Sequence, residues 1–249
     1  LKRWYSERKD LQKNLKKAKD AKNEVEIEYW DKRQLVKKIN LNSLYGAILN
    51  PGCRFFDKRI GQSTTLTGRT IVKHMSAEVN KIITGEYDHV GKAMIYGDTD
   101  SCYFSAYPVL KDEIAAGKIP WTKDNVITLY DQVCEQANTT FPDMMLKAFH
   151  CPKSRSDVIA AGREVVAETG LFITKKRYAA LVYDIEGFRT DEDGKLGKVK
   201  AMGLDLKRSD TPVFMQDFLK DLLDMVLQKK PEKELLEAIS QFRREFKDR

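Results

Sequence analysis

Two aspartates, Asp98 and Asp100, stand two residues apart in the segment YGDTDS at positions 96–101. Apolar residues flank this segment on both sides, which predicts a β-hairpin that carries both carboxylates on its tight turn. Carboxylate oxygens are the hard ligands that Mg²⁺ prefers, and Mg²⁺ held in this way bridges to substrate phosphates. The mutual repulsion of the two charges also favours a nearby cation. Taken alone, the pattern fits an ordinary turn better, because Asp and Gly are common turn residues.

A second group of side chains follows one face of a predicted helix. Lys38, Asn42, Tyr45 and Leu49 are spaced by four, three and four residues, and this spacing aligns side chains on a helix. The lysine offers a mobile charge for a phosphate, the asparagine an amide, and the tyrosine a ring that packs on a base pair. An amphipathic helix with Tyr45 in the core is the alternative interpretation. A lysine and an asparagine in the same stripe argue against it.

A third group is basic and surrounds a predicted strand. Its members are Lys175, Lys176, Arg177, Lys200, Lys207 and Arg208. Tyr178 is interleaved with them, and basic residues alternating with an aromatic side chain suit a nucleic-acid backbone. Taken singly, an ordinary basic turn is the better interpretation.

Helices and strands must position these residues. Periodicity and helix breakers predict helices at about 1–20, 26–49, 65–84, 123–149, 212–227 and 231–246. Strands are predicted at 93–96, 101–104, 158–166 and 178–188, and irregular or extended structure at 53–62. The short break at 20–23 predicts that the first two helices form a hairpin. The expected class is α+β, an antiparallel sheet with helices.

Charge is concentrated at the N-terminus. The chain has 44 Lys and Arg against 37 Asp and Glu, a net charge of +7. Residues 1–22 hold nine basic and three acidic residues, a composition that attracts phosphates, although most charge runs are only solvated helix faces. Arg8 lies inside the apolar stripe of Trp4, Leu11 and Leu15. We therefore expect Arg8 to face a partner or a ligand.

Composition excludes several protein classes. No apolar run approaches the roughly 20 residues of a membrane-spanning helix, and the N-terminus is too basic and polar for a signal peptide. The four cysteines form no CxxC pair, so neither a zinc ribbon nor a disulfide framework is indicated, and a reducing, cytoplasmic setting is expected. Because the chain starts with Leu1 inside a helical pattern, we expect a piece of a larger protein.

Together, the three groups resemble a family B DNA polymerase, most closely the tailed-phage members. KINLNSLYG at 38–46 matches the motif B pattern Kx₃NSxYG, and TGR at 67–69 matches the end of the TxxGR element that follows it. YGDTDS at 96–101 is similar to motif C, and KKRY at 175–178 to the KKxY element. The segment at 200–210 resembles the element entering the thumb. The resemblance covers essentially the whole chain.

The resemblance implies a domain organisation and a set of nucleotide contacts. Residues 1–50 would be the helical fingers hairpin, 51–203 most of the palm, and 204–249 the start of a truncated thumb. The residues implied to bind the deoxynucleoside triphosphate (dNTP) are Arg8, Lys38, Asn42 and Tyr45. Tyr45 would pack on the nascent base pair. A second basic residue of the family is replaced here by Gln12.

The resemblance also implies a metal site and DNA contacts. Asp100 would be the principal ligand of motif C, with Asp98 beside it and Glu164 as a further carboxylate. Two Mg²⁺ ions would clamp the attacking primer oxygen and the leaving pyrophosphate, while Lys38 neutralises charge on the triphosphate. The residues implied to contact primer–template DNA are Lys175, Lys176, Arg177, Tyr178, Lys200 and Arg208.

Two parts of the family pattern are missing from residues 1–249. The chain has no DxxSLYPS-type motif A, which supplies the other metal-bridging aspartate, and no exonuclease domain. We therefore expect the isolated chain to be inactive or nearly so, and to need the N-terminal portion in cis or as a separate chain. The expected location is the cytoplasm, that of a host cell if the gene belongs to a phage.

Two alternative functions are open. Nucleotide cyclases and reverse transcriptases also place carboxylates on a β-hairpin, but they would lack the Kx₃NSxYG pattern upstream of it. The other alternative is a non-catalytic DNA-binding or assembly subunit of a split polymerase, in which the motifs serve only as a phosphate-gripping surface. Substituting both Asp98 and Asp100 would separate this alternative from an enzyme, because DNA binding would persist while reconstituted activity disappears.

Overall fold

The computed structural model describes residues 1–192 and 194–247. The α-helices are α1 Lys2–Asp20, α2 Glu24–Leu49, α3 Lys58–Thr84, α4 Tyr107–Ala115, α5 Lys123–Phe149, α6 Val213–Leu227 and α7 Glu232–Lys247. The strands are β1 Met94–Asp98, β2 Ser101–Phe104, β3 Val165–Thr174, β4 Arg177–Ile185, β5 Phe188–Arg189 and β6 Lys198–Met202. Short 3₁₀ helices lie at Lys153–Val158 and Asp205–Lys207.

The predicted α+β class is confirmed, since helices alternate with two antiparallel sheets in the described part of the chain. Packing divides the chain into two compact units, Leu1–Thr70 and Ile71–Arg249, with the boundary inside α3. Among the described helices, none is both long enough and apolar enough to span a bilayer.

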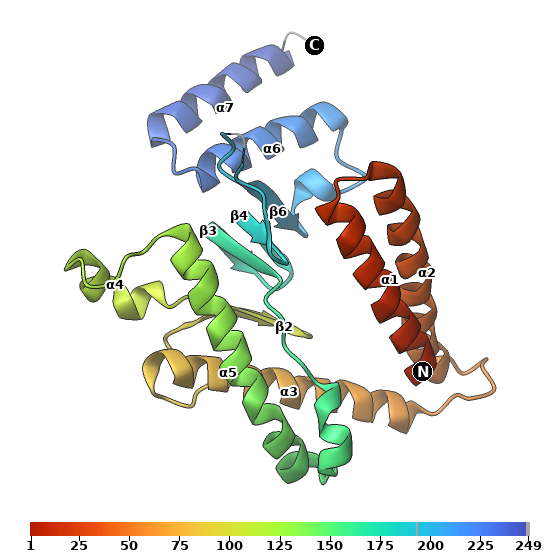
Figure 1. Cartoon of the computed structure of the whole chain (residues 1–249). Helices are drawn as coiled ribbons and strands as arrows, with labels where there is room; N and C mark the ends of the chain where they lie inside the picture. Colours follow the sequence, from red (N-terminus) through yellow and green to blue (C-terminus); the bar gives the residue numbers. More distant parts are fainter. Residues whose placement is uncertain (193, 248–249) are drawn as a thin grey trace. The chain divides into compact units, whose positions relative to one another are not determined.

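The first unit is built on a helical hairpin, as predicted (Figure 1). α1 and α2 are joined by a short turn in which the Asn23 side chain accepts a hydrogen bond from the Glu26 backbone N–H at 3.3 Å. This cap satisfies one of the N–H groups left free at a helix start. Ala18 is buried in the hairpin, and Glu7 on α1 forms an ion pair with Lys37 on α2.

A tight corner connects α2 to α3. The Asp57 carboxylate accepts the backbone N–H two residues further on at 2.9 Å, so α3 begins at Lys58. The prediction of irregular structure for 53–62 is therefore wrong from Lys58 onward. Gly61 concealed this helix start, because glycine disfavours helix interiors. The packing explains it: a Cβ on Gly61 would lie 2.0 Å from Leu49 Cδ2, so the leucine occupies that space.

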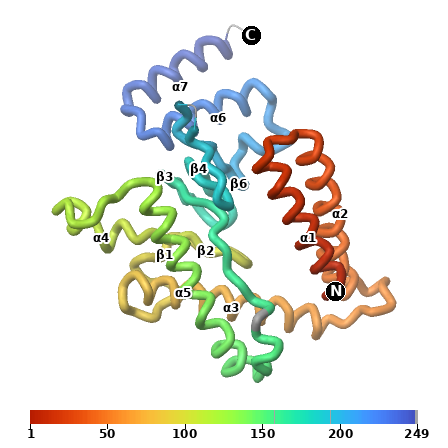
Figure 2. Tube along the Cα trace, in the orientation of Figure 1, coloured from red at the N-terminus to blue at the C-terminus, as the bar shows by residue number. Residues whose placement is uncertain are grey.

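The second unit has a helical layer that supports the first sheet. The C-terminal half of α3 lies beside α5 (Figure 2). Val79 of α3 forms a buried cluster there with Val133 and Ala137 of α5. Met94 of β1 and Phe104 of β2 pack against the same cluster. Apolar contacts to α3 and α5 thus hold the β1–β2 hairpin, which the sequence predicts, in place.

The second sheet is larger and antiparallel throughout. β4 is its central strand and pairs with β3, β5 and β6. α6 lies over one face of this sheet (Figure 1). There, Ala179 and Leu181 of β4 pack on Leu223 and Leu227 of α6. Successive side chains of a strand point to opposite faces, so Tyr178 projects to the other face, where it meets the β1–β2 hairpin.

The strand predicted at 158–166 is wrong over most of its length, because β3 starts only at Val165. The Asn138 side chain on α5 accounts for the difference. Its amide donates to the Ala161 carbonyl at 2.9 Å, and its oxygen accepts the Ala161 N–H at 2.6 Å. A side chain therefore takes the two backbone groups that a neighbouring strand would otherwise pair.

The C-terminal helices pack through aromatic rings. Phe218 of α6 and Phe242 of α7 stack with their ring centroids 3.8 Å apart and their planes at 10°. Phe214 and Phe246 stack on each other with centroids 5.9 Å apart, and both also pack on Phe242. Both helices agree with the predicted ranges to within a residue or so.

We expect the Asn80→Leu substitution to destabilise the second unit by about 2–4 kcal/mol. Asn80 on α3 is fully buried; its amide donates to the Glu86 carbonyl at 2.8 Å, and its oxygen accepts the Ala93 N–H at 3.0 Å. Leucine would leave the buried Ala93 N–H without a partner, and the Glu86 carbonyl would keep only the Asp88 N–H at 3.1 Å. Chemical denaturation measures the loss. Gln136→Ala, at an exposed amide of α5, is the control and should stay within about 0.5 kcal/mol of wild type; an equal effect of both substitutions would contradict the expectation.

Candidate active site

The two aspartates lie on the turn of the β1–β2 hairpin. Asp98 pairs with Ser101 across the ladder, which leaves Thr99 and Asp100 as a two-residue loop. Thr99 has a φ of 47°, a conformation that is unfavourable for a β-branched residue. The Asp100 backbone N–H donates to the Asp98 carbonyl at 2.6 Å and closes the loop. Backbone strain of this kind persists where a turn must hold particular side chains in place.

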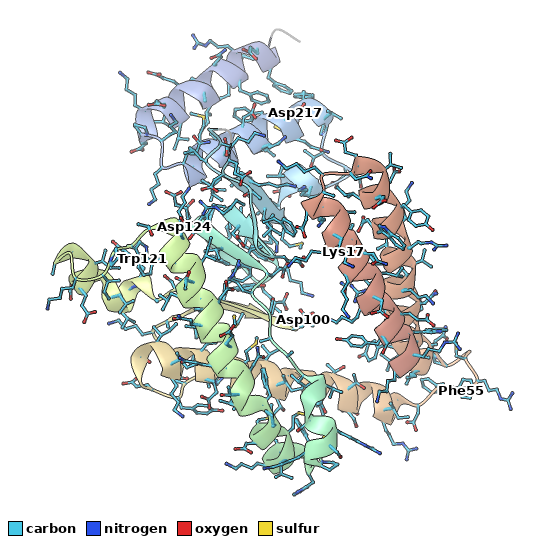
Figure 3. All side chains as sticks on the ribbon, viewed as in Figure 1. Lys17, Phe55, Asp100, Trp121, Asp124 and Asp217 are labelled. Carbon is cyan, nitrogen blue, oxygen red and sulfur yellow. The ribbon has the colours of Figure 1, made fainter. Side chains whose placement is uncertain are left out.

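Both carboxylates are available to a cation. Asp98 is half-buried and Asp100 is exposed at the tip of the hairpin, where Figure 3 labels it. Neither forms an ion pair within the described residues; the Asp98 carboxylate only accepts the Thr99 hydroxyl at 3.0 Å. In the described part of the chain, no His, Cys, Asp or Glu residues gather in groups of three or more that could hold a metal. A metal held here would need further ligands from substrate, water or another segment.

Four aromatic rings join the hairpin to the larger sheet. Tyr96 and Tyr103 pair across the hairpin, Phe172 and Tyr178 pair across β3 and β4, and the ring centroids of the four lie 5.2–6.2 Å apart. The Tyr103 hydroxyl donates to the Tyr178 hydroxyl at 3.2 Å. Burial raises the pKa of Tyr103, and this hydrogen bond raises it further, so the group stays protonated at neutral pH. The carboxylate turn and the larger sheet are thereby one packed structure.

A basic turn lies beside this aromatic cluster. Lys175 and Lys176 form the two-residue loop between β3 and β4, and both are exposed. Neither has an ion-pair partner among the described residues. The Lys176 backbone N–H donates to the Tyr96 hydroxyl at 2.7 Å, so the lysine turn is connected directly to the strand that carries Asp98. The Tyr178 side chain is buried, and contact between it and DNA stays a prediction.

Several residues with predicted roles are paired with neighbouring charges. Glu164, the predicted further metal ligand, forms an ion pair with Lys200 at 2.8 Å. Arg208 holds Asp210 through two hydrogen bonds of 2.9 and 2.6 Å. These bonds lower the pKa of Asp210 to about 2.

Arg177 is also engaged. It contacts Asp205 at 3.2 Å and donates to the Gly203 carbonyl at 3.2 Å. A metal or a phosphate at Glu164, Lys200, Arg177 or Arg208 would have to replace these contacts.

The predicted nucleotide-binding residues lie together in the first unit. Lys38, Asn42 and Tyr45 are exposed along one face of α2, and the Tyr45 hydroxyl shares a hydrogen bond of 2.7 Å with Thr65 on α3. Arg8 on α1 is half-buried, and its guanidinium donates to the Gln34 side chain at 3.4 Å. The unit therefore presents a lysine, an amide and a ring that is held in place by α3.

The sequence reasoning missed the linking residues Tyr96, Tyr103 and Phe172. A signal for the first two was present, because a two-residue turn at 99–100 makes positions 96 and 103 cross-strand partners. No comparable signal existed for the hydrogen bond between Tyr96 and Lys176, which are 80 residues apart.

Comparisons with known proteins show which family the sequence resembles. The sequence profile of DNA polymerase family B matches residues 1–141 and 154–249. The DNA-directed DNA polymerase of Escherichia phage RB69 is 30% identical over 204 residues, which are 78% of this chain and 22% of that protein. The enzyme of Enterobacteria phage T4 is 26% identical over 236 residues, 86% of this chain and 24% of that protein.

A cellular relative matches over a similar range. The DNA polymerase alpha catalytic subunit of Drosophila melanogaster is 28% identical over 241 residues, 96% of this chain and 13% of that protein. The chain thus spans a quarter or less of the length of these relatives.

Proposed function

This chain belongs to DNA polymerase family B, and from that premise we propose that it contributes to template-directed DNA synthesis. The reaction transfers a nucleotidyl group from a dNTP to the 3′-hydroxyl of a primer and releases pyrophosphate. We assign residues 1–50 to the fingers, 51–203 to the palm and 204–249 to the start of the thumb, of which the final two residues lie outside the described part of the chain.

One observation carries this proposal. A turn whose two carboxylates form no ion pair within the described residues is linked through Tyr96 to a turn whose two lysines form none there either. Asp98 and Asp100 provide charge for a cation, and Lys175 and Lys176 provide charge for a DNA backbone. A polymerase must hold both ligands at once, because the reacting phosphate lies between metal and primer. A carboxylate turn with a purely structural role would not need to be connected to a lysine turn.

Asp98 and Asp100 suit Mg²⁺ chemically, since their oxygens are hard ligands and no cation of the protein neutralises them within the described residues. Glu164 would join them on leaving Lys200. Two bound Mg²⁺ ions would supply activation of the primer hydroxyl and stabilisation of the leaving pyrophosphate. The remaining ligands would come from the triphosphate and from the family's motif A, which residues 1–249 do not contain.

The first unit would bind the dNTP. Lys38 and Arg8 would neutralise the charge that builds on the triphosphate during transfer, as cationic clamps do in phosphoryl transfer. Asn42 would donate its amide to a phosphate oxygen. The Tyr45 ring, fixed by Thr65, would pack on the nascent base pair.

The second unit would bind primer–template DNA. Exposed Lys175 and Lys176 are the best placed for phosphate contacts, since both are free of ion pairs in the described structure. Lys200, Arg177 and Arg208 would add contacts after exchanging their present carboxylate or carbonyl partners. Tyr178 would act by packing beneath the lysine turn.

Primer extension with residues 1–249 alone tests the proposal. We expect salt-sensitive binding of a labelled primer–template duplex, and no extension with Mg²⁺ or Mn²⁺, because the carboxylate pair lacks the motif A ligand. We further expect extension by a completed polymerase, in which residues 1–249 are joined to a segment carrying the family's motif A. Asp100→Ala is the control in both.

Three other outcomes have distinct meanings. Extension by residues 1–249 alone that Asp100→Ala abolishes would mean that a carboxylate of this chain, Glu164 first, completes the metal site. DNA binding without any activity in the completed polymerase would favour the non-catalytic assembly subunit. Absence of DNA binding would contradict both functions.

A further inference from the structure

Lys176 has an unusual backbone conformation. Its φ is 63°, in the left-handed region where residues other than glycine are disfavoured. It occupies the second position of the two-residue loop that Thr174 and Arg177 close by pairing, a position normally taken by glycine or asparagine. A conformation of this kind persists only where surrounding contacts fix it.

Contacts hold the Lys176 backbone from two sides. On one side, its N–H donates to the Tyr96 hydroxyl at 2.7 Å. On the other, its carbonyl lies against Gly203, where a Cβ would come within 2.0 Å of the Lys176 oxygen. Gly203 is itself held, because its carbonyl accepts the Arg177 guanidinium at 3.2 Å. The backbone of the turn is fixed while both lysine side chains remain exposed.

The ring and the hydroxyl of Tyr96 make separate contributions. The ring packs on Phe172 and Tyr178, with centroids 5.7 and 5.5 Å away. The hydroxyl accepts the Lys176 N–H. Tyr96 also lies two residues before Asp98 on β1, so a single side chain connects the backbone of the lysine turn to the strand that ends in the carboxylate turn.

We propose that Tyr96 is a positioning residue for DNA synthesis, whose hydroxyl holds the Lys175–Lys176 turn in register with Asp98 and Asp100. This inference rests on the proposed function, in which the lysines bind a phosphodiester of the primer and the carboxylates bind metal. Phosphoryl transfer requires the attacking oxygen and the reacting phosphate to be aligned closely, and small misplacements lower the rate strongly. A lysine turn that was free to move would bind DNA more weakly and would not fix the primer end.

Hydrogen exchange at the Lys176 amide tests the contact directly. We expect Tyr96→Phe to speed exchange at this amide about ten-fold, because phenylalanine keeps the ring but removes the acceptor. Tyr103→Phe is the matched control, since it removes a hydroxyl from the same aromatic cluster without touching the turn. It should leave the exchange rate of the Lys176 amide unchanged.

Binding of a fluorescent primer–template duplex to residues 1–249 tests the consequence. We expect Tyr96→Phe to weaken binding about five-fold with an unchanged salt dependence, since no charge is removed. Replacing Lys175 and Lys176 together by alanine should instead reduce the salt slope by about two. Gly203→Ala displaces the turn from the opposite side and should resemble Tyr96→Phe.

The outcomes separate this inference from the proposed function. If the double lysine variant loses affinity but Tyr96→Phe binds DNA and exchanges like wild type, the positioning role of Tyr96 is wrong and the proposed function stands. If the double lysine variant keeps full affinity and slope, the proposed DNA-binding role of the turn fails. Should Tyr96→Phe not fold, Gly203→Ala decides, and wild-type affinity in that variant overturns the inference.

Discussion

Replacing Asp100 with asparagine in the completed polymerase should lower the rate of nucleotide incorporation by about a thousand-fold or more. The substitution keeps the size of the side chain and removes the charge that would hold a metal, and metal ions stabilise such transition states by several kcal/mol. Asp100 is exposed on a strained two-residue turn and lacks an ion pair in the described structure. Single-turnover incorporation of one nucleotide measures the effect.

The control must show that removing an aspartate charge at another position does not lower the incorporation rate. Asp143→Asn makes the same change at an exposed aspartate of α5 and should leave the incorporation rate within about two-fold of wild type. DNA affinity of Asp100→Asn should be equal to or higher than wild type, because a negative charge is removed from beside the DNA. Incorporation that survives Asp100→Asn would remove this residue from the metal site.

The β1–β2 hairpin and the α1–α2 hairpin could be predicted because local sequence determines them. Apolar runs on both sides of a two-residue turn fix the register of the hairpin, which places Asp98 opposite Ser101. The break at 20–23 has a capping Asn23, and the apolar stripe of α1 includes the buried Leu15. In both cases the residues that decide the structure are close together in the chain.

The wrong predictions for the starts of α3 and β3 have a different cause. In each case a side chain that is distant in the sequence determines the backbone conformation against the local preference. Leu49 fills the space beside Gly61 and allows α3 to start early. Asn138 takes the backbone groups of Ala161 and delays the start of β3. Local propensity contains no record of either partner, and tertiary context overrides such propensities routinely.

The candidate site shows the same division. Residue types and motifs predicted roles for the aspartates, the lysines and the α2 face, but they could not tell which of these charged side chains are free of ion pairs. Glu164 is paired with Lys200 and Arg208 with Asp210, whereas Asp100 is unpaired in the described structure. Ion pairs depend on which side chains lie close together in the fold. The positions of charged residues in the sequence do not specify that proximity.

Lys37 and Lys38 are neighbours in the sequence, but the structure gives their side chains different environments. Lys37 is directed into the hairpin, where it pairs with Glu7 and lies 6.0 Å from the Trp4 ring centroid. Lys38 is exposed on the face shared with Asn42, and no ion pair engages it in the described residues. Lys37 therefore supports the hairpin, while Lys38 is available to a phosphate.

We expect Lys38→Met in the completed polymerase to lower kcat/KM for the incoming dNTP about a hundred-fold. Methionine keeps the length of the side chain but removes a charge-assisted hydrogen bond, which contributes roughly 1.5–3 kcal/mol. Steady-state single-nucleotide incorporation at varied dNTP concentration measures the change. Lys16→Met, at an exposed lysine of α1, is the matched control, and DNA affinity should be nearly equal in the two variants. A loss shared equally by Lys16→Met, or one explained by weaker DNA binding, would mean that Lys38 contributes only general positive charge.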